Sequence, residues 1–190
     1  TTLVEVVCTQ HFASAAAGRA PSRLTDRRPL SWNLELALTP EVMREIQPVP
    51  GLVQALVDVQ GLHAHRERLY VVLSELYSNA LEHGLLELDA QLKADAEGFH
   101  RYYEERTCRL KSLCAGRIGI ALQHRPCEDG GEVVIRVEDS GNGFDLDEVE
   151  NRLRSSTGYH GRGIPLVRSL CQSLTYPGCG NCAEARYRWS

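Results

Sequence analysis

Three residues in one stretch of the chain could support acid–base and metal chemistry. Glu75, Asn79 and His83 are spaced four residues apart, so on an α-helix each is turned about 40° from the last and they share one side. A carboxylate there could orient a nucleophile, and an amide oxygen one turn away could bind a hard cation such as Mg²⁺. Because an isolated pair of this kind is usually only an exposed polar stripe, the pattern needs support from elsewhere.

Two glycine-containing motifs further along the chain provide that support. Asp139-Ser-Gly141-Asn-Gly143 follows a predicted strand; glycines let the backbone approach a ligand where a Cβ would collide, and the aspartate could accept a hydrogen bond from an amino group. Gly161-Arg162-Gly163 precedes an apolar predicted helix, whose first amides and positive dipole end favour phosphate. Each motif alone could be a turn or a close-packed loop. Their order along the chain argues against coincidence and indicates a nucleotide site, although a Walker-type loop and a protein-kinase-like His-Arg-Asp loop are absent.

The first predicted elements are a strand and two short helices. Residues 31–38 alternate between apolar and polar side chains, which is the period of a half-buried strand. Thr39, Pro40 and Glu41 are typical of a helix start. The prolines at positions 48 and 50 should interrupt that helix, and residues 52–59 should form a second one. Residues 1–7 are a β-branched run followed by an aperiodic linker, and we favour a strand from a separate upstream domain over an edge strand of the same sheet.

The remaining elements would hold the motifs in place. The patterns predict a long helix over residues 65–83, an amphipathic helix over 99–113 with its apolar stripe in the core, and a hairpin of strands 118–123 and 132–137. A helix over 164–174 and a final hairpin over 175–190 follow. This order predicts an α+β two-layer sandwich, in which a mixed, mainly antiparallel sheet carries helices on one face.

Composition and charge exclude several classes of function. The formal net charge is −4 and the sequence pI is near 6.0, which disfavours broad nucleic-acid binding. No apolar run approaches the roughly 18 residues of a membrane span, and no secretory signal is present, so we expect a cytoplasmic protein that does not bind membranes. The seven cysteines are scattered and are expected to be reduced. Cys179 and Cys182 have redox or zinc spacing, but a hairpin turn explains that spacing more simply.

The three motifs together resemble those of the GHKL ATPase superfamily, and within it the anti-sigma-factor serine kinases of the RsbW type. The stretch from Glu75 to His83 is similar to the N box, Asp139 to Phe144 to the G1 box, and Gly158 to Ile164 to the G2 box. This resemblance covers residues 31–190. It implies a Bergerat-type ATP-binding fold with ATP and Mg²⁺ as cofactors.

The resemblance also implies a role for each residue. Asn79 would hold Mg²⁺ on the nucleotide phosphates, and Asp139 would bind the adenine amino group. Glu75 would be the base for a substrate serine hydroxyl. The remaining cofactor-binding candidates are residues near the base, ribose and phosphates: His83, Gly141, Gly143, Gly161, Arg162 and Gly163. His83 could equally be a helix-end histidine. A lid would span roughly residues 145–160.

The long insertion over residues 85–117 distinguishes the chain from simple anti-sigma kinases, and we expect it near the partner surface. In this respect the chain resembles the C-terminal domain of HsbR-like response regulators, whose middle domain is a SpoIIE-type phosphatase. Residues 1–30 would then be the last strand of that phosphatase and a linker. The implied partners are a STAS-domain anti-sigma antagonist and a sigma factor or secondary anti-sigma factor, and the implied assembly is a homodimer.

Two functional classes stay open at this point. A serine protein kinase and a nucleotide-gated binding module that sequesters a sigma factor or antagonist both need Glu75 and Asn79 in an intact pocket. A sensor histidine kinase core is disfavoured, because no phospho-accepting helical hairpin precedes residue 31 and the predicted lid is short. Phosphate transfer to a partner serine would separate the first two classes.

Overall fold

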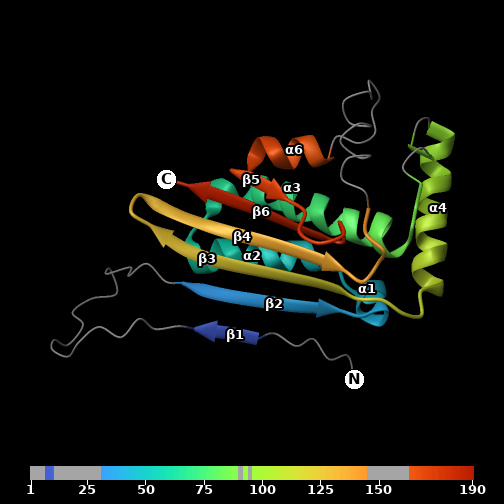
Figure 1. Ribbon diagram of the computed structural model, residues 1–190, viewed down its shortest axis with the longest axis horizontal. Coiled ribbons are helices and arrows are strands. Elements are labelled where there is room, and N and C mark those ends of the chain that lie inside the picture. The colour runs from blue at the N-terminus through green and yellow to red at the C-terminus, as the bar shows by residue number, and fades with distance from the viewer. Residues whose placement is uncertain (1–6, 11–30, 90–91, 94–95, 145–162) are drawn as a thin grey trace.

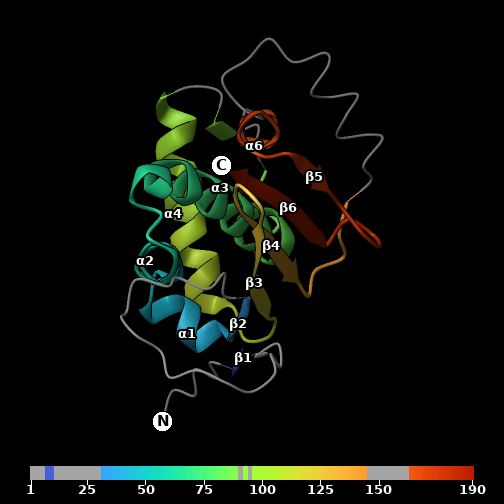
Figure 2. The same cartoon turned by 90° about the vertical axis from the view of Figure 1, so that its left-hand side faces the viewer.

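The computed structural model describes residues 7–10, 31–89, 92–93, 96–144 and 163–190. Its strands form one six-stranded sheet in the order β1-β2-β3-β4-β6-β5, and each neighbouring pair is antiparallel. Helices cover one face of this sheet, as Figures 1 and 2 show from two sides. The predicted α+β two-layer sandwich is therefore confirmed. The strands are β1 (Val7–Gln10), β2 (Trp32–Leu38), β3 (Ile118–Cys127), β4 (Gly130–Asp139), β5 (Ser173–Thr175) and β6 (Cys182–Trp189).

The helices follow the predicted order with altered boundaries. They are α1 (Pro40–Glu45), α2 (Pro48–Gln60), the 3₁₀-helix η1 (His63–His65), α3 (Arg66–Ser78), the π-helix η2 (Asn79–Leu85), α4 (Ala96–Ser112) and α6 (Gly163–Leu170). Helix α1 ends at Glu45, before Pro48, as predicted. The second helix starts earlier than predicted, at Pro48, because the first turn of a helix needs no amide donor. The predicted helix over residues 164–174 ends early, at Leu170, and Ser173–Thr175 pairs with β6 as β5. None of the described helices is long and apolar enough to cross a bilayer.

The core lies between the sheet and α2 and α3. Alternate residues of the central strands point toward the helices, and Leu38, Ile120 and Ile135 are at most 2% exposed. Residues of α3 at helical spacing face them, including the fully buried Leu69 and Leu73. This packing fixes the direction of α3, which leads into the first of the predicted site motifs.

The N-terminal strand departs from the favoured prediction. Val7–Gln10 pairs antiparallel with β2 and so forms an edge of the same sheet, which agrees with the edge-strand alternative. Of the predicted strand over residues 1–7, only Val7 lies in this pairing. Backbone pairing to the open edge of β2 explains the difference, because an extended segment needs no matching hydrophobic face to add to an edge. An origin of residues 1–30 in an upstream phosphatase stays a prediction, and residues 1–6 and 11–30 lie outside the described part of the chain.

Helix α4 also differs from the prediction in the face that it buries. Phe99 and Tyr103, which we expected in the core, are 49% and 46% exposed. Tyr102 is fully buried instead, because its hydroxyl reaches a carboxylate on η2. The C-terminal part of the predicted stripe, Leu110 and Leu113, does pack against the core. At the N-terminal part of α4 the polar contact of Tyr102 replaces the predicted burial of Phe99 and Tyr103.

Candidate functional site

The predicted polar stripe lies where α3 changes into a π-helix. Asn79 begins η2 directly after α3, and the amide of Leu86 donates to the carbonyl of Leu81 at 2.9 Å, five residues back. π-Helical turns are frequent at functional sites, because they re-aim side chains within an otherwise regular helix. The extra residue in this turn ends the four-residue alignment after Asn79.

His83 lies beyond that change. Its side chain is exposed, and its ring Nδ1 lies 3.0 Å from the carbonyl oxygen of Leu88. Of the two roles considered for His83, this hydrogen bond favours the helix-end histidine over a contact with Glu75 or phosphate.

Glu75 lies against the first turn of α6. A Cβ at Gly163 would overlap Oε2 of Glu75, so only glycine permits this close approach. Burial raises the pKa of Glu75; Lys93 nearby lowers it and Glu82 raises it further. The site therefore holds a half-buried carboxylate with a raised pKa beside a helix N-terminus, where anionic groups are also favoured.

Asp139 ends β4 and faces η2. Its side chain is buried, and Oδ1 accepts a hydrogen bond from the amide of Gly141 at 2.8 Å. A Cβ at Gly84 would overlap this carboxylate, and a Cβ at Gly141 would overlap the carbonyl oxygen of Gly84. Burial raises the pKa of Asp139 despite the hydrogen bond from Gly141. Two glycines thus let the end of β4 pack directly on the backbone of η2.

The turn between β5 and β6 packs against Asp139 and bonds to its backbone. The backbone amide of Asp139 donates to the carbonyl of Asn181 at 2.9 Å, and Nδ2 of Asn181 donates to the carbonyl of Asp139 at 2.9 Å. Gly143 has a φ of 75°, and a Cβ there would overlap the carbonyl oxygen of Cys179. The spacing of Cys179 and Cys182 thus belongs to the turn of the predicted hairpin. This turn also supports the Asp139 segment.

The structure brings together most of the predicted site at one end of the sheet. Asn79 starts the same π-helix whose Gly84 touches Asp139, and Glu75 lies one turn before it against Gly163. Gly141 and Gly143 continue from Asp139. Gly161 and Arg162, like the predicted lid over residues 145–160, lie outside the described residues.

Sequence reasoning missed several residues that support the site. Glu82 on η2 is only 6% exposed, and its carboxylate accepts hydrogen bonds from Tyr102, Arg106 and Lys93. Gly84 and Asn181 hold Asp139 in place. No periodicity marks these residues, because their partners are separated from them by insertions and turns. A charged residue directly after the apolar pair Ala80–Leu81 was the one available signal for Glu82.

The chain matches the model of the histidine kinase-like ATPase domain over residues 36–187. This match covers most of the chain, from within β2 to within β6, and includes every described site residue. The chain therefore belongs to the histidine kinase-like ATPase domain family, a class whose members bind ATP, usually with Mg²⁺. No curated protein matches the chain.

The residues at this end of the sheet fit such a nucleotide. The amide oxygen of Asn79 is a suitable ligand for Mg²⁺, which commonly takes only one or two protein ligands alongside phosphate oxygens. The carboxylate of Asp139 can accept a hydrogen bond from an adenine amino group. The N-terminus of α6 favours phosphate. The glycines at positions 141, 143 and 163 let the elements around the site pack closely, against Gly84, Cys179 and Glu75 in turn.

Proposed function

We propose that the chain is an ATP-dependent serine protein kinase of the anti-sigma type, which phosphorylates a STAS-domain anti-sigma antagonist. The observation that carries this proposal is the position of Glu75. Its half-buried carboxylate lies beside the first turn of α6 and one helical turn before Asn79. This is where a base is needed if phosphates lie at the N-terminus of α6 and the substrate hydroxyl approaches them.

Each described residue then has a definite task. Bound Mg-ATP would supply the γ-phosphoryl group and a cation that neutralises phosphate charge. Asn79 holds the cation, Asp139 orients the adenine, and the first amides of α6 hold phosphate oxygens. Glu75 accepts the proton of the serine hydroxyl. The serine oxygen then bonds to the γ-phosphorus, while the bond between the γ-phosphorus and the oxygen that leaves with ADP breaks. The raised pKa of Glu75 suits this task, because it makes the carboxylate a stronger base.

Phosphate transfer to a STAS-domain protein tests this proposal. The chain is incubated with Mg-ATP and a candidate STAS-domain protein, and the intact mass of that protein is measured. We expect a gain of one phosphate with the unmodified chain and no gain with Glu75→Gln, which should still bind Mg-ATP. Undiminished transfer by Glu75→Gln would contradict the role of Glu75 as base.

A different outcome would favour a different class. Tight Mg-ATP binding without transfer to any STAS-domain candidate would indicate a nucleotide-gated binding module, which sequesters a sigma factor or an antagonist without modifying it. The sequence resemblance adds three further proposals. They are a homodimer, a sigma factor or secondary anti-sigma factor as a second partner, and an upstream SpoIIE-type phosphatase. Size-exclusion chromatography with light scattering would test the homodimer.

A further inference from the structure

A buried carboxylate joins the inserted helix α4 to the candidate nucleotide site. Glu82 accepts hydrogen bonds from the hydroxyl of Tyr102 at 2.6 Å, from Nε of Arg106 at 2.9 Å and from Nζ of Lys93 at 3.1 Å. Burial alone would raise the pKa of Glu82, but the hydrogen bonds and the two positive charges lower it. Glu82 is therefore a fully paired anion, and a buried anion of this kind holds its position strongly.

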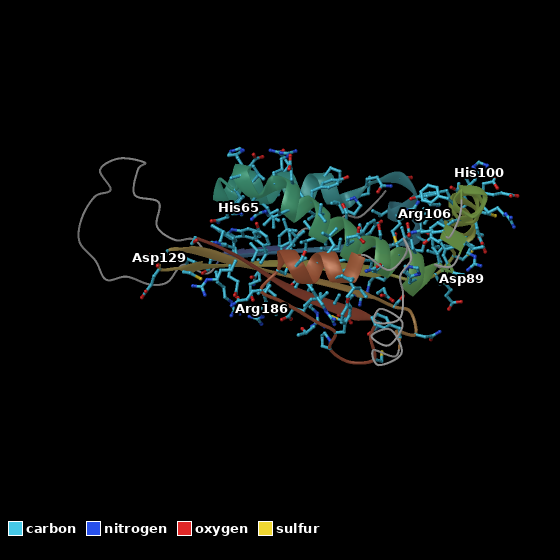
Figure 3. The ribbon with its side chains drawn as sticks, turned by 90° about the horizontal axis from the view of Figure 1, so that it is seen from above. His65, Asp89, His100, Arg106, Asp129 and Arg186 are labelled. Atoms are coloured by element: carbon cyan, nitrogen blue, oxygen red, sulfur yellow. The ribbon has the colours of Figure 1, made fainter. Side chains whose placement is uncertain are left out.

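All three partners of Glu82 come from the insertion between the N box and β3. A third residue of α4 adds to these contacts, because Arg109 donates from Nη1 to the carbonyl oxygens of Leu86 at 2.6 Å and Glu87 at 2.7 Å. Helix α4 thus holds a side chain of η2 and also the backbone that directly follows it. Figure 3 shows Arg106 at one end of the molecule, opposite His65 and Asp129, and in Figure 1 this is the end where β4 finishes.

The segment that α4 holds is the one that places the site residues. Asn79 begins η2, and Gly84 near its end packs against Asp139. Lys93 adds an electrostatic link, because it pairs with Glu82 and also lowers the pKa of Glu75. A shift of Glu82 would therefore disturb Asn79 and Asp139 through η2, and would change the charge near Glu75 through Lys93.

We propose that Glu82 is a positioning residue for the nucleotide site and that the insertion holds it, through Tyr102 and Arg106 of α4 and through Lys93, which precedes α4. This inference rests on the proposed nucleotide-binding function. None of the three partners needs to touch the ligand; they act on it through η2. The role of the insertion is then to hold η2 in place, so that a change in α4 alters the affinity of the site for nucleotide.

Two substitutions on α4 test the inference, with a matched control on the same helix. Arg106→Gln removes a charged partner of Glu82, and Tyr102→Phe removes a single hydroxyl. Arg101→Gln is the control, because Arg101 forms an exposed pair with Glu97 at 3.4 Å, within α4. We expect the Kd for Mg-ATP to rise about tenfold in Arg106→Gln and about threefold in Tyr102→Phe, and to stay within about twofold in the control. Arg106→Lys should recover part of the affinity.

A second measurement separates positioning from a merely structural role. Coupling between two sites is reciprocal, so Mg-ATP should slow hydrogen exchange at the amides of residues 102–109 in the unmodified chain. A lower unfolding midpoint in both variants, with unchanged Kd and no slowing of exchange, would overturn the inference. If Arg106→Gln does not fold, the Kd of Tyr102→Phe for Mg-ATP tests the inference alone. No Mg-ATP binding by the unmodified chain would contradict the proposed function itself, and the inference with it.

Discussion

At the scale of single residues, two site carboxylates lie where their charge is costly. Burial raises the pKa of both Glu75 and Asp139 above the ordinary values. When folding raises the pKa of an acid, the folded protein becomes less stable as the pH rises from the pKa in the unfolded chain to the pKa in the folded chain. The reason is that the unfolded chain releases the proton at the lower pH. The full cost is present above the folded pKa. Both carboxylates therefore lower the stability of the nucleotide-free protein, which is expected of groups that serve a function.

Glu75→Gln and Asp139→Asn should each stabilise the nucleotide-free chain at neutral pH, because each amide removes the cost of a buried charge. In Asp139→Asn the side-chain amide oxygen can still accept from the amide of Gly141, so the turn should persist. We expect a gain of up to about 1 kcal/mol, or about 2–4 °C in Tm. Thermal unfolding by circular dichroism measures it. Glu138→Gln, at the partly exposed neighbouring carboxylate, is the control and should give no gain. Destabilisation by both site variants would mean that these carboxylates support the fold.

At the scale of elements, the contact between η2 and the end of β4 determines the shape of the site. Gly84 and Gly141 allow the two backbones to touch, and the turn between β5 and β6 closes the other side of Asp139. A side chain at the contact would separate the elements that carry Asn79 and Asp139. This contact can be tested without changing a residue expected to touch the nucleotide.

Gly84→Ala should destabilise the chain by about 1–3 kcal/mol, because its Cβ would overlap the carboxylate of Asp139. It should also weaken Mg-ATP binding. Gly51→Ala is the matched control: Gly51 lies within α2, nothing lies within 4 Å of its Cβ position, and the substitution should stabilise the helix by about 0.5–1 kcal/mol. Urea unfolding of both variants measures the difference. Equal effects of the two substitutions would show that the close contact at Gly84 is not needed.

At the scale of the whole molecule, most of the architecture followed from local patterns. The alternation in residues 31–38 and the apolar spacing around Leu69 and Leu73 correctly predicted β2 and α3, because each buries one face against a single core. The elements that carry the motifs do lie together: Glu75 of α3 lies against Gly163, and η2, which begins at Asn79, packs on Asp139 through Gly84. Local patterns contain no information on contacts between distant segments. For this reason the sequence could not decide whether the N-terminal strand pairs with β2, and it could not predict the π-helix at Asn79 or the rotation of α4 around Glu82.

Titration of the whole chain with Mg-ATP and with Mg-GTP tests the central claim most directly, since every proposal depends on an adenine nucleotide site at this end of the sheet. Isothermal titration calorimetry should show saturable binding of Mg-ATP. Mg-GTP should bind at least about tenfold more weakly, because guanine presents a carbonyl oxygen to the carboxylate of Asp139 where adenine presents an amino group. Equal affinity for the two nucleotides, or no binding of either, would contradict the account.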